Sequence, residues 1–255
     1  MFPKQHDPLQ VMSHAVVGFP NLTENEQAID GLVAAGVNLI ELQVPFSDPV
    51  ADGHTLVNAC YAALQQGGSV RATLALAKTV SAKHPNTSFV LMSYLNPLYR
   101  YGLEQLFTDA AAAGIKGLII PDMPVEQFEP YIPLLDELGI APILMVTPNT
   151  SDERLERIAA SARGMLYVVS RMGVTGKQTQ WGDSFKAYIE RIRRFTDLPL
   201  AVGFGVQAAD DLKALTGVAE VAAFCSKYIE WQRDTGSEQA AKNMRQLLLD
   251  AKLVK

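Results

Sequence analysis

The stretch from Val37 to Gly53 reads VNLIELQVPFSDPVADG. Its first half is an apolar run typical of a buried parallel strand, and the run ends at the carboxylate of Glu41. Side chains alternate along a strand, so Glu41 and Gln43 point to the same face at its carboxyl end. A second carboxylate, Asp52, follows in a loop punctuated by proline and glycine. Burying a carboxylate costs free energy unless the group is paired with a partner or takes part in a reaction. Two acids here therefore suit acid–base chemistry. The alternative is a structural carboxylate that caps loop amides.

The chain repeats one unit, a helix closed by glycine and followed by a short apolar strand. Leu32–Val37 leads into the strand that ends at Glu41, and Ala111–Ile115 leads into Leu118–Ile120. Glycine suits the end of a helix, since it adopts a left-handed backbone without strain. Eight apolar strands alternate with helical patterns: Ala15–Val17, Val37–Ile40, Phe89–Met92, Leu118–Ile120, Pro142–Val146, Met165–Val169, Leu200–Val202 and Val221–Phe224.

Eight alternating strand–helix units predict an α/β fold of the (β/α)₈ TIM-barrel type, and a doubly wound open sheet is the alternative. No shift in composition marks a boundary, so we expect a single barrel domain over residues 1–255. Barrel enzymes place their chemistry at the carboxyl ends of the strands, which is where Glu41 stands.

Composition narrows the class of protein. The 255 residues are 48% hydrophobic, and 22 lysines and arginines against 27 acids give a net charge of −5. This balance argues against nucleic-acid binding. The cysteines Cys60 and Cys225 match no zinc or redox spacing, so the sequence predicts reduced thiols and no metal site. Since we find no signal peptide and no apolar run of membrane-spanning length, we expect a cytoplasmic protein without membrane contact.

Three loops after the late strands carry glycines or a helix start where an anion could bind: Ser170–Gly176, Gly203–Val206 and Cys225–Lys227. Glycine lets backbone N–H groups approach an anion closely, and a helix N-terminus adds a positive dipole. We expect Ser226 to cap the helix that follows and Lys227 to add charge at a phosphate site. Ordinary turn glycines are the alternative. The long polar loop Arg171–Asp183 is expected to form a lid.

Five motifs follow the order and spacing of a known family. Glu41–Gly53 has the pattern Glu-Leu-x-x-Pro-Phe-Ser-Asp-Pro-x-Ala-Asp-Gly, and the others are Tyr94–Asn96, Pro121–Glu126, Ser170–Gly176 and Gly203–Gly205. On these motifs the chain resembles the alpha subunit of tryptophan synthase over nearly its whole length. The resemblance implies a barrel that cleaves indole-3-glycerol phosphate to indole and glyceraldehyde 3-phosphate, a step of tryptophan biosynthesis, without a cofactor. It also implies a β-subunit partner, in an α₂β₂ assembly, that uses pyridoxal phosphate and receives the indole through a tunnel.

Carried over by position, the resemblance gives roles to single residues. Glu41 is implied as the general acid–base group, and Asp52 as the acceptor of the indole N–H that stabilises the cationic indolenine. Thr175 is implied to contact Asp52 when the lid closes. The implied substrate-binding residues are Tyr167, Thr175, Gly176, Phe204, Gly205 and Ser226. The surface implied to meet the β subunit comprises Pro45, Asp48, Pro49 and Asn96.

Several positions depart from the family pattern. They are Gln43 and Cys225, where the family has glycine, His14, where it has phenylalanine, Phe19, where it has an acid, and His54, where it has proline. A Cβ at Cys225 is expected to crowd the amide that meets the phosphate, and Lys227 to compensate with its charge.

Two other functions stay open. One is a weakly active or non-catalytic alpha-type subunit that mainly activates the β subunit, which the crowded phosphate site favours. The other is a phosphosugar isomerase on a related barrel. That enzyme would need a different acid pair at the ends of strands one and five, where this chain has His14 and Thr147.

Overall fold

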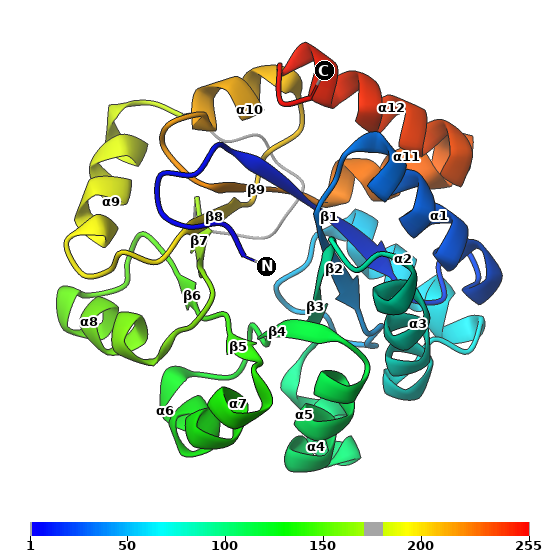
Figure 1. The fold of residues 1–255 in the computed structure, drawn as a ribbon, viewed down its shortest axis with the longest axis horizontal. Coiled ribbons are helices and arrows are strands. Elements are labelled where there is room, and N and C mark those ends of the chain that lie inside the picture. The colour runs from blue at the N-terminus through cyan, green and yellow to red at the C-terminus, as the bar shows by residue number, and fades with distance from the viewer. Residues whose placement is uncertain (1, 171–180, 255) are drawn as a thin grey trace.

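The structure is a computed structural model that describes residues 2–170 and 181–254. Figure 1 looks down onto a ring of parallel strands surrounded by helices. The strands are β1 (Gln10–Val16), β2 (Leu39–Gln43), β3 (Ser88–Met92), β4 (Ile115–Ile119), β5 (Ala141–Pro142), β6 (Met145–Val146), β7 (Leu166–Val169), β8 (Leu200–Gly203) and β9 (Val221–Phe224).

The helices lie outside this ring and connect successive strands, except β5 and β6, which follow each other directly. They are α1 (Leu22–Ala35), α2 (His54–Gln65), α3 (Val70–Lys83), α4 (Leu95–Tyr101), α5 (Leu103–Ala112), α6 (Val125–Phe128), the 3₁₀ turn η1 (Glu129–Tyr131), α7 (Ile132–Leu138), α8 (Asp152–Ser161), α9 (Asp183–Arg193), α10 (Ala209–Leu215), α11 (Ser226–Thr235) and α12 (Ser237–Asp250).

The sheet closes into a barrel through the segment Ala141–Val146. The strand order is β5-β4-β3-β2-β1-β9-β8-β7-β6, and β5 and β6 are the two halves of this one segment. β4 pairs with the first half and β7 with the second. Between the halves, the N–H of Ile143 donates to Leu118 O and the N–H of Tyr167 donates to Leu144 O, each at 2.9 Å. The predicted (β/α)₈ barrel is therefore confirmed, and the open sheet is wrong.

The helix ends follow local signals that the sequence contains. The Asn21 side chain caps α1 by accepting the N–H of Glu24 at 3.0 Å, and α1 ends at Gly36, whose φ of 106° favours glycine. α8 begins at Asp152, because the Ser151 hydroxyl accepts the N–H of Arg154 and fixes the first turn.

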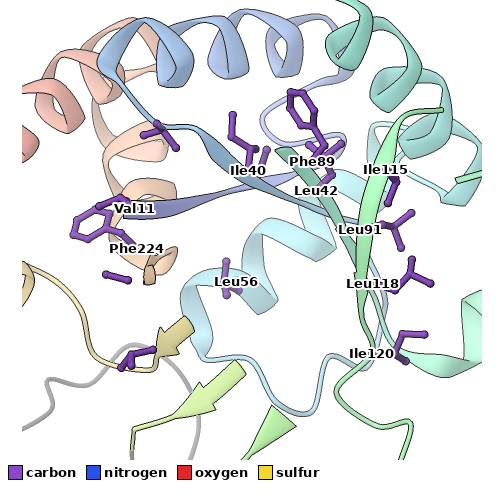
Figure 2. Close-up of a cluster of buried hydrophobic side chains, with 14 of the residues drawn as sticks. Val11, Ile40, Leu42, Leu56, Phe89, Leu91, Ile115, Leu118, Ile120 and Phe224 are labelled. Carbon is purple, nitrogen blue, oxygen red and sulfur yellow. The ribbon is translucent and has the colours of Figure 1, made fainter. Parts of the chain in front are cut away.

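The apolar core has two layers, one on each side of the strands. Outward-facing residues pack between the sheet and the helices, and Figure 2 shows part of this layer. It includes Ile40, Leu42, Leu56, Phe89, Leu91, Leu118 and Phe224. The inner layer fills the barrel and includes Met12, Leu39, Val90, Met92, Ile119, Met165 and Ala201. β2 therefore alternates as predicted: Leu39 points inward while Ile40 and Leu42 point outward.

The amino-terminal end of the barrel is covered by apolar packing, which leaves the other end for chemistry. The N-terminal segment runs across the ring in Figure 1, and Phe2 packs on the inner layer. Its ring lies so close to Gly117 and Gly164 that a Cβ at either position would come within 3.0 Å of it. No helix within the described ranges, 2–170 and 181–254, has both the length and the apolar character needed to cross a bilayer.

Candidate active site

Two buried carboxylates face the carboxyl-terminal mouth of the barrel. Glu41 on β2 is 4% exposed, and Asp52 in the loop after β2 is 8% exposed. The register of β1 and β2 places His14 directly beside Glu41, and Gln43 lies one inward position further along β2. Because alternate residues share a face, His14, Glu41 and Gln43 all point into the barrel. We call the set His14, Glu41, Gln43, Asp52 and Tyr94 the mouth cluster.

A chain of hydrogen bonds links His14 to Asp52 through Gln43. The Gln43 amide Nε2 donates to Asp52 Oδ2 at 2.9 Å, and His14 Nε2 lies 2.7 Å from Gln43 Oε1. Since Asp52 can only accept as a carboxylate, the amide must present its NH₂ to Asp52 and its oxygen to His14. The imidazole therefore carries a proton on Nε2 and donates it to Gln43.

Tyr94 holds Asp52 from the other side. Its hydroxyl donates to Asp52 Oδ2 at 3.0 Å and accepts the N–H of Ala51 at 3.1 Å. The Tyr94 side chain is fully buried, so this hydroxyl is fixed by packing as well as by hydrogen bonds. Two donors on one oxygen are the arrangement that a carboxylate anion accepts.

Burial and charge act on the mouth cluster in opposite directions. Burial raises the pKa of Asp52, and His14, Gln43 and Tyr94 offset part of that rise. Burial by itself lowers the pKa of His14, but the Glu41 carboxylate and the contact with Cys225 outweigh it and raise this pKa well above its usual value. Burial also raises the pKa of the Cys225 thiol. The mouth therefore holds several groups whose charge depends on one another.

Two polar atoms at the centre of the mouth lack hydrogen bonds. Within the described residues, His14 Nδ1 and Glu41 Oε2 are buried and meet no donor or acceptor in hydrogen-bond geometry. His14 Nδ1 lies 3.3 Å from Glu41 Oε1. Cys225, the residue after β9, lies beside them. One potential metal-ligand atom from each of His14, Glu41 and Cys225 lies within 4.8 Å of the other two.

Apolar side chains line the space in front of the carboxylates. A cavity of about 30 Å³ is bounded by Glu41, Asp52, Met92, Ile119, Tyr167 and Phe204. A larger hollow of about 440 Å³ shares Ala51, Pro121, Met145 and Phe204 with it and extends over the loops after β4 and β6. A flat apolar molecule with a few polar groups suits such a lining.

Tyr167 on β7 reaches across the mouth and packs edge-on to Phe204, with ring centroids 6.5 Å apart. A Cβ at Gly203 would overlap the Tyr167 hydroxyl, so glycine is required there for this packing. Phe204 and Gly205 both have positive φ, 70° and 111°, which turns the chain sharply after β8. Tyr167 and Phe204, both predicted from the sequence to bind substrate, lie in the wall of the small cavity.

The expected phosphate residues Gly205 and Ser226 line one small hollow of about 20 Å³ beside Tyr167 and Cys225. The prediction that Ser226 caps α11 is wrong, because the chain turns into the helix directly after β9. Cys225 takes the N-cap position, and Ser226 is the first helical residue. Lys227 also lines the hollow, and its ammonium pairs with Glu230 Oε2 at 3.0 Å. The expected Thr175, Gly176 and most of the lid lie outside the described residues.

The expected partner surface divides into exposed and buried residues. Asp48 and Asn96 are exposed, whereas Pro45 and Pro49 are buried. Pro45 and Asn96 line a shallow hollow of about 700 Å³ between the loop after β2 and the helices α3 and α4. Beside them, Val50 is 74% exposed, an unusual state for a large apolar side chain that the sequence reading missed.

Comparison with known proteins places this geometry in a family. The family model for the tryptophan synthase alpha chain matches residues 4–254. The chain belongs to the tryptophan synthase alpha chain family. A family member from Desulfotalea psychrophila is 38% identical over 233 residues, which is 91% of each chain. Another, from Desulforapulum autotrophicum, is 36% identical over 96% of each chain.

Solved structures of the family share the fold. A tryptophan synthase chain from Mycobacterium tuberculosis superimposes with a TM-score of 0.87 at 30% identity, over 96% of this chain and 92% of that one. The resemblance that the sequence motifs indicated is therefore confirmed, as is the membership of an enzyme family of tryptophan biosynthesis.

The sequence reading missed Tyr94 as a site residue, although the signal was present. Tyr94 lies two positions beyond Met92, so the period of two places it on the inner face with Val90. Its hydrogen bond to Asp52 joins two motifs that lie far apart in the sequence, Glu41–Gly53 and Tyr94–Asn96. The contact of His14 with Glu41 and Cys225 had no local signal, because it depends on the register of three strands.

Proposed function

We propose that this chain cleaves indole-3-glycerol phosphate to indole and glyceraldehyde 3-phosphate. The observation that carries the proposal is the pair of buried carboxylates, Glu41 and Asp52, facing one apolar cavity at the mouth of the barrel. Family membership supports the same substrate.

Glu41 is proposed as the acid–base group. A proton delivered to the indole carbon C3 makes a cationic indolenine, and the C–C bond to the glycerol chain then breaks. Loss of the proton from the adjacent glycerol hydroxyl forms the aldehyde, while the bonding electrons restore neutral indole. Both proton transfers occur within reach of one side chain, and Glu41 Oε2, which makes no hydrogen bond within the described residues, is free to take part.

Asp52 is proposed to accept the indole N–H and to stabilise the positive charge that develops on that nitrogen. Tyr94 and Gln43 hold its carboxylate in place, so little reorganisation is needed during the reaction. Gly205, Ser226 and the first amides of α11, a ten-residue helix, are proposed to bind the substrate phosphate. From the family resemblance alone, Gly176 is proposed for the same phosphate site and Thr175 for a contact with Asp52.

The proposed reaction needs only proton transfer and charge stabilisation, so we infer that this chain uses no cofactor. Pyridoxal phosphate belongs, in this proposal, to the β partner. Cys60 and Cys225 are both free thiols, which fits the reducing cytoplasm proposed as its location.

The test of the lyase proposal is Glu41→Gln, which keeps the side-chain size and removes the proton transfer. We expect indole release to fall by about 10²–10⁴-fold, measured with purified chain in the presence of a chelator. Glu126→Gln, at an exposed glutamate outside the mouth, is the matched control and should retain full activity. Near-normal indole release from a folded Glu41→Gln variant would contradict the assignment.

A second candidate function is activation of the β subunit without efficient cleavage. Gln43 favours it, because its amide occupies Asp52 Oδ2 and its side chain stands in the mouth. Indole release measured with and without a β subunit separates the two proposals. A chain that stimulates β while releasing no indole in either assay would support activation alone.

We also propose that a β subunit docks on the rim formed by Pro45, Asp48, Pro49 and Asn96, in an α₂β₂ assembly. Exposed Asp48 and Val50 lie in the same loop as Asp52, so a partner bound there would cover the mouth. Asp48→Lys is expected to weaken β binding in a titration calorimeter while leaving isolated indole release nearly unchanged. Asp250→Lys, at the end of α12, is the control, because α12 packs on α1, where Arg245 donates to Ala35 O, and contributes no residue to the proposed docking rim.

A further inference from the structure

We propose that His14, Glu41 and Cys225 form a binding site for a divalent transition-metal ion of the zinc class. Nδ1 or Nε2 of the imidazole, the thiol sulfur and a carboxylate oxygen supply a group of ligand atoms that all lie within 4.8 Å of one another. In a tetrahedral zinc site the ligand atoms surround the ion at about 2.0–2.3 Å. The three side chains are thus close enough to converge on one ion through small rotamer changes.

The chemistry of the donors selects the class of metal. A thiolate and an imidazole favour zinc and related ions over magnesium and calcium, which prefer oxygen ligands only. The thiolate and the carboxylate together supply two negative charges, which balance a divalent cation inside a largely apolar barrel. Binding releases to solvent the proton of the Cys225 thiol and any proton on His14 Nδ1 or Glu41.

The hydrogen bonds around His14 are those expected of a metal-binding histidine. Its Nε2 donates to Gln43 Oε1 at 2.7 Å, and Gln43 is in turn anchored by Asp52. Metal-binding histidines commonly donate their second nitrogen to such an oxygen, which fixes the ring and directs the other nitrogen at the ion. Here that other nitrogen is Nδ1, the atom that faces Glu41 at 3.3 Å.

The unsatisfied atoms of the mouth point to a missing partner. Within the described residues, buried His14 Nδ1 and Glu41 Oε2 make no hydrogen bond, and Nδ1 has only the Glu41 Oε1 contact at 3.3 Å, although leaving such atoms without hydrogen bonds is costly. A cation bound between them would satisfy both. Three protein ligands leave a fourth position open, and the adjoining cavity of about 30 Å³ is large enough for a bound water there.

Three residues of the site stand where the family resemblance implies other residues. That resemblance implies phenylalanine at the position of His14 and glycine at the positions of Cys225 and Gln43, the group that orients His14. All three lie in the mouth and contact one another or Glu41. The prediction of no metal site rested on sequence spacing, and these ligands come from β1, β2 and the end of β9.

A bound ion would also regulate the proposed lyase. If Glu41 is the acid–base group, as proposed above, a metal on its carboxylate prevents proton transfer. We therefore expect added Zn²⁺ to inhibit indole release and a chelator to restore it. This consequence rests on the proposed function, whereas the binding site does not.

The deciding experiment measures metal binding without substrate. The full chain is stripped with a chelator, dialysed against Zn²⁺ with a non-thiol reductant, and its metal content is measured by mass spectrometry. We expect about one equivalent per chain, and Cys225→Ala and His14→Phe each to weaken Zn²⁺ binding by at least about 100-fold in calorimetry. Gln43→Leu removes only the supporting amide and should weaken binding by about 10–100-fold.

Two controls test whether the effect belongs to these ligands. Cys60→Ala removes the other thiol of the chain and His54→Gln removes an exposed imidazole; both should keep one equivalent. Co²⁺ in the wild type should give an intense near-ultraviolet thiolate-to-metal band, which needs no variant to fold. Sub-stoichiometric Zn²⁺ in the wild type, no such band, or unchanged affinity in Cys225→Ala would each overturn the proposal. Indole release in chelator tests the lyase separately.

Discussion

The mouth of the barrel and its outer surface use the same carboxylate group in opposite surroundings. Glu41 and Asp52 are almost fully buried, while the Glu126 and Glu129 side chains are 38% and 34% exposed. Outside, hydrogen bonds from arginines of α8 lower the pKa of both glutamates. Inside, burial raises the pKa of Asp52.

The difference teaches that access to water, more than the number of contacts, decides how strongly the charge of a carboxylate interacts with its surroundings. Glu129 receives two short contacts from Arg157, yet water screens the pair, so its effect on stability is small. Glu41 has fewer partners, but its charge acts in a low-dielectric cavity where each interaction is stronger. The carboxylates of the mouth therefore lower the stability of the fold but are suited to chemistry. Those on the surface have only a small effect on stability and are not placed for chemistry.

The strongest test of this contrast is Asp52→Asn. The variant keeps hydrogen-bonding capacity and loses the charge that is proposed to stabilise the indolenine, so kcat for indole release should fall by about 10²–10³-fold. A change confined to KM would instead give Asp52 a binding role.

The same variant has a stability signature. Asp52 has a raised pKa in the folded protein, so below the unfolded value of 3.8 both states are protonated and its charge costs nothing. As the pH rises through the folded-state pKa, the wild type acquires a buried charge that lowers its free energy of unfolding. The stability of Asp52→Asn relative to wild type should therefore increase with pH in chemical denaturation. A relative stability that is independent of pH would contradict burial as the cause.

Gly203→Ala tests whether the mouth of the barrel is packed more tightly than its surface. Its Cβ would overlap the buried Tyr167 ring, and overpacking of this kind costs about 1–3 kcal/mol. Displaced Tyr167 should also lower indole release. Gly182→Ala, where a Cβ meets no heavy atom within 4 Å, should change the free energy of unfolding less and leave activity intact. Equal effects of the two variants in denaturant titrations would show that the mouth is no more tightly packed than the surface.

The smallest effect is expected for Glu129→Gln on the outer surface. The Arg157 hydrogen bond lowers the pKa of Glu129 despite a small opposing effect of burial. Its stabilisation is therefore present above the ordinary value of 4.5 and is lost as the pH falls through the lower folded-state pKa. We expect a slight fall in Tm at neutral pH that vanishes in high salt or acid. Glu156→Gln, at an exposed acid of α8, is the control and should leave Tm at neutral pH nearly unchanged.

Much of the fold was predictable because its signals are local. Glycine-terminated helices and short apolar strands recur along the chain, and the barrel follows from their number and alternation. The division of Ala141–Val146 into two short strands had no such signal, since it arises where the barrel closes on β4 and β7. Likewise, the N-cap of α11 falls on Cys225 because of how tightly the chain turns after β9.

The sequence by itself determined which side chains face the barrel interior. Glu41 and Gln43 share a face because successive residues of a strand alternate, and this holds whatever the strand pairs with. The motif around Asp52 likewise indicates the family, because it lies in consecutive residues of the chain.

Only the tertiary structure decided which of these side chains meet. His14 lies beside Glu41 because β1 pairs with β2 in one register, and Cys225 joins them because β9 pairs with the other edge of β1. A shift of one residue in either pairing would turn His14 or Cys225 away from Glu41, although the sequence pattern of each strand would be unchanged. Register depends on contacts between distant segments, so the link from His14 through Gln43 to Asp52 could be seen only in the folded barrel.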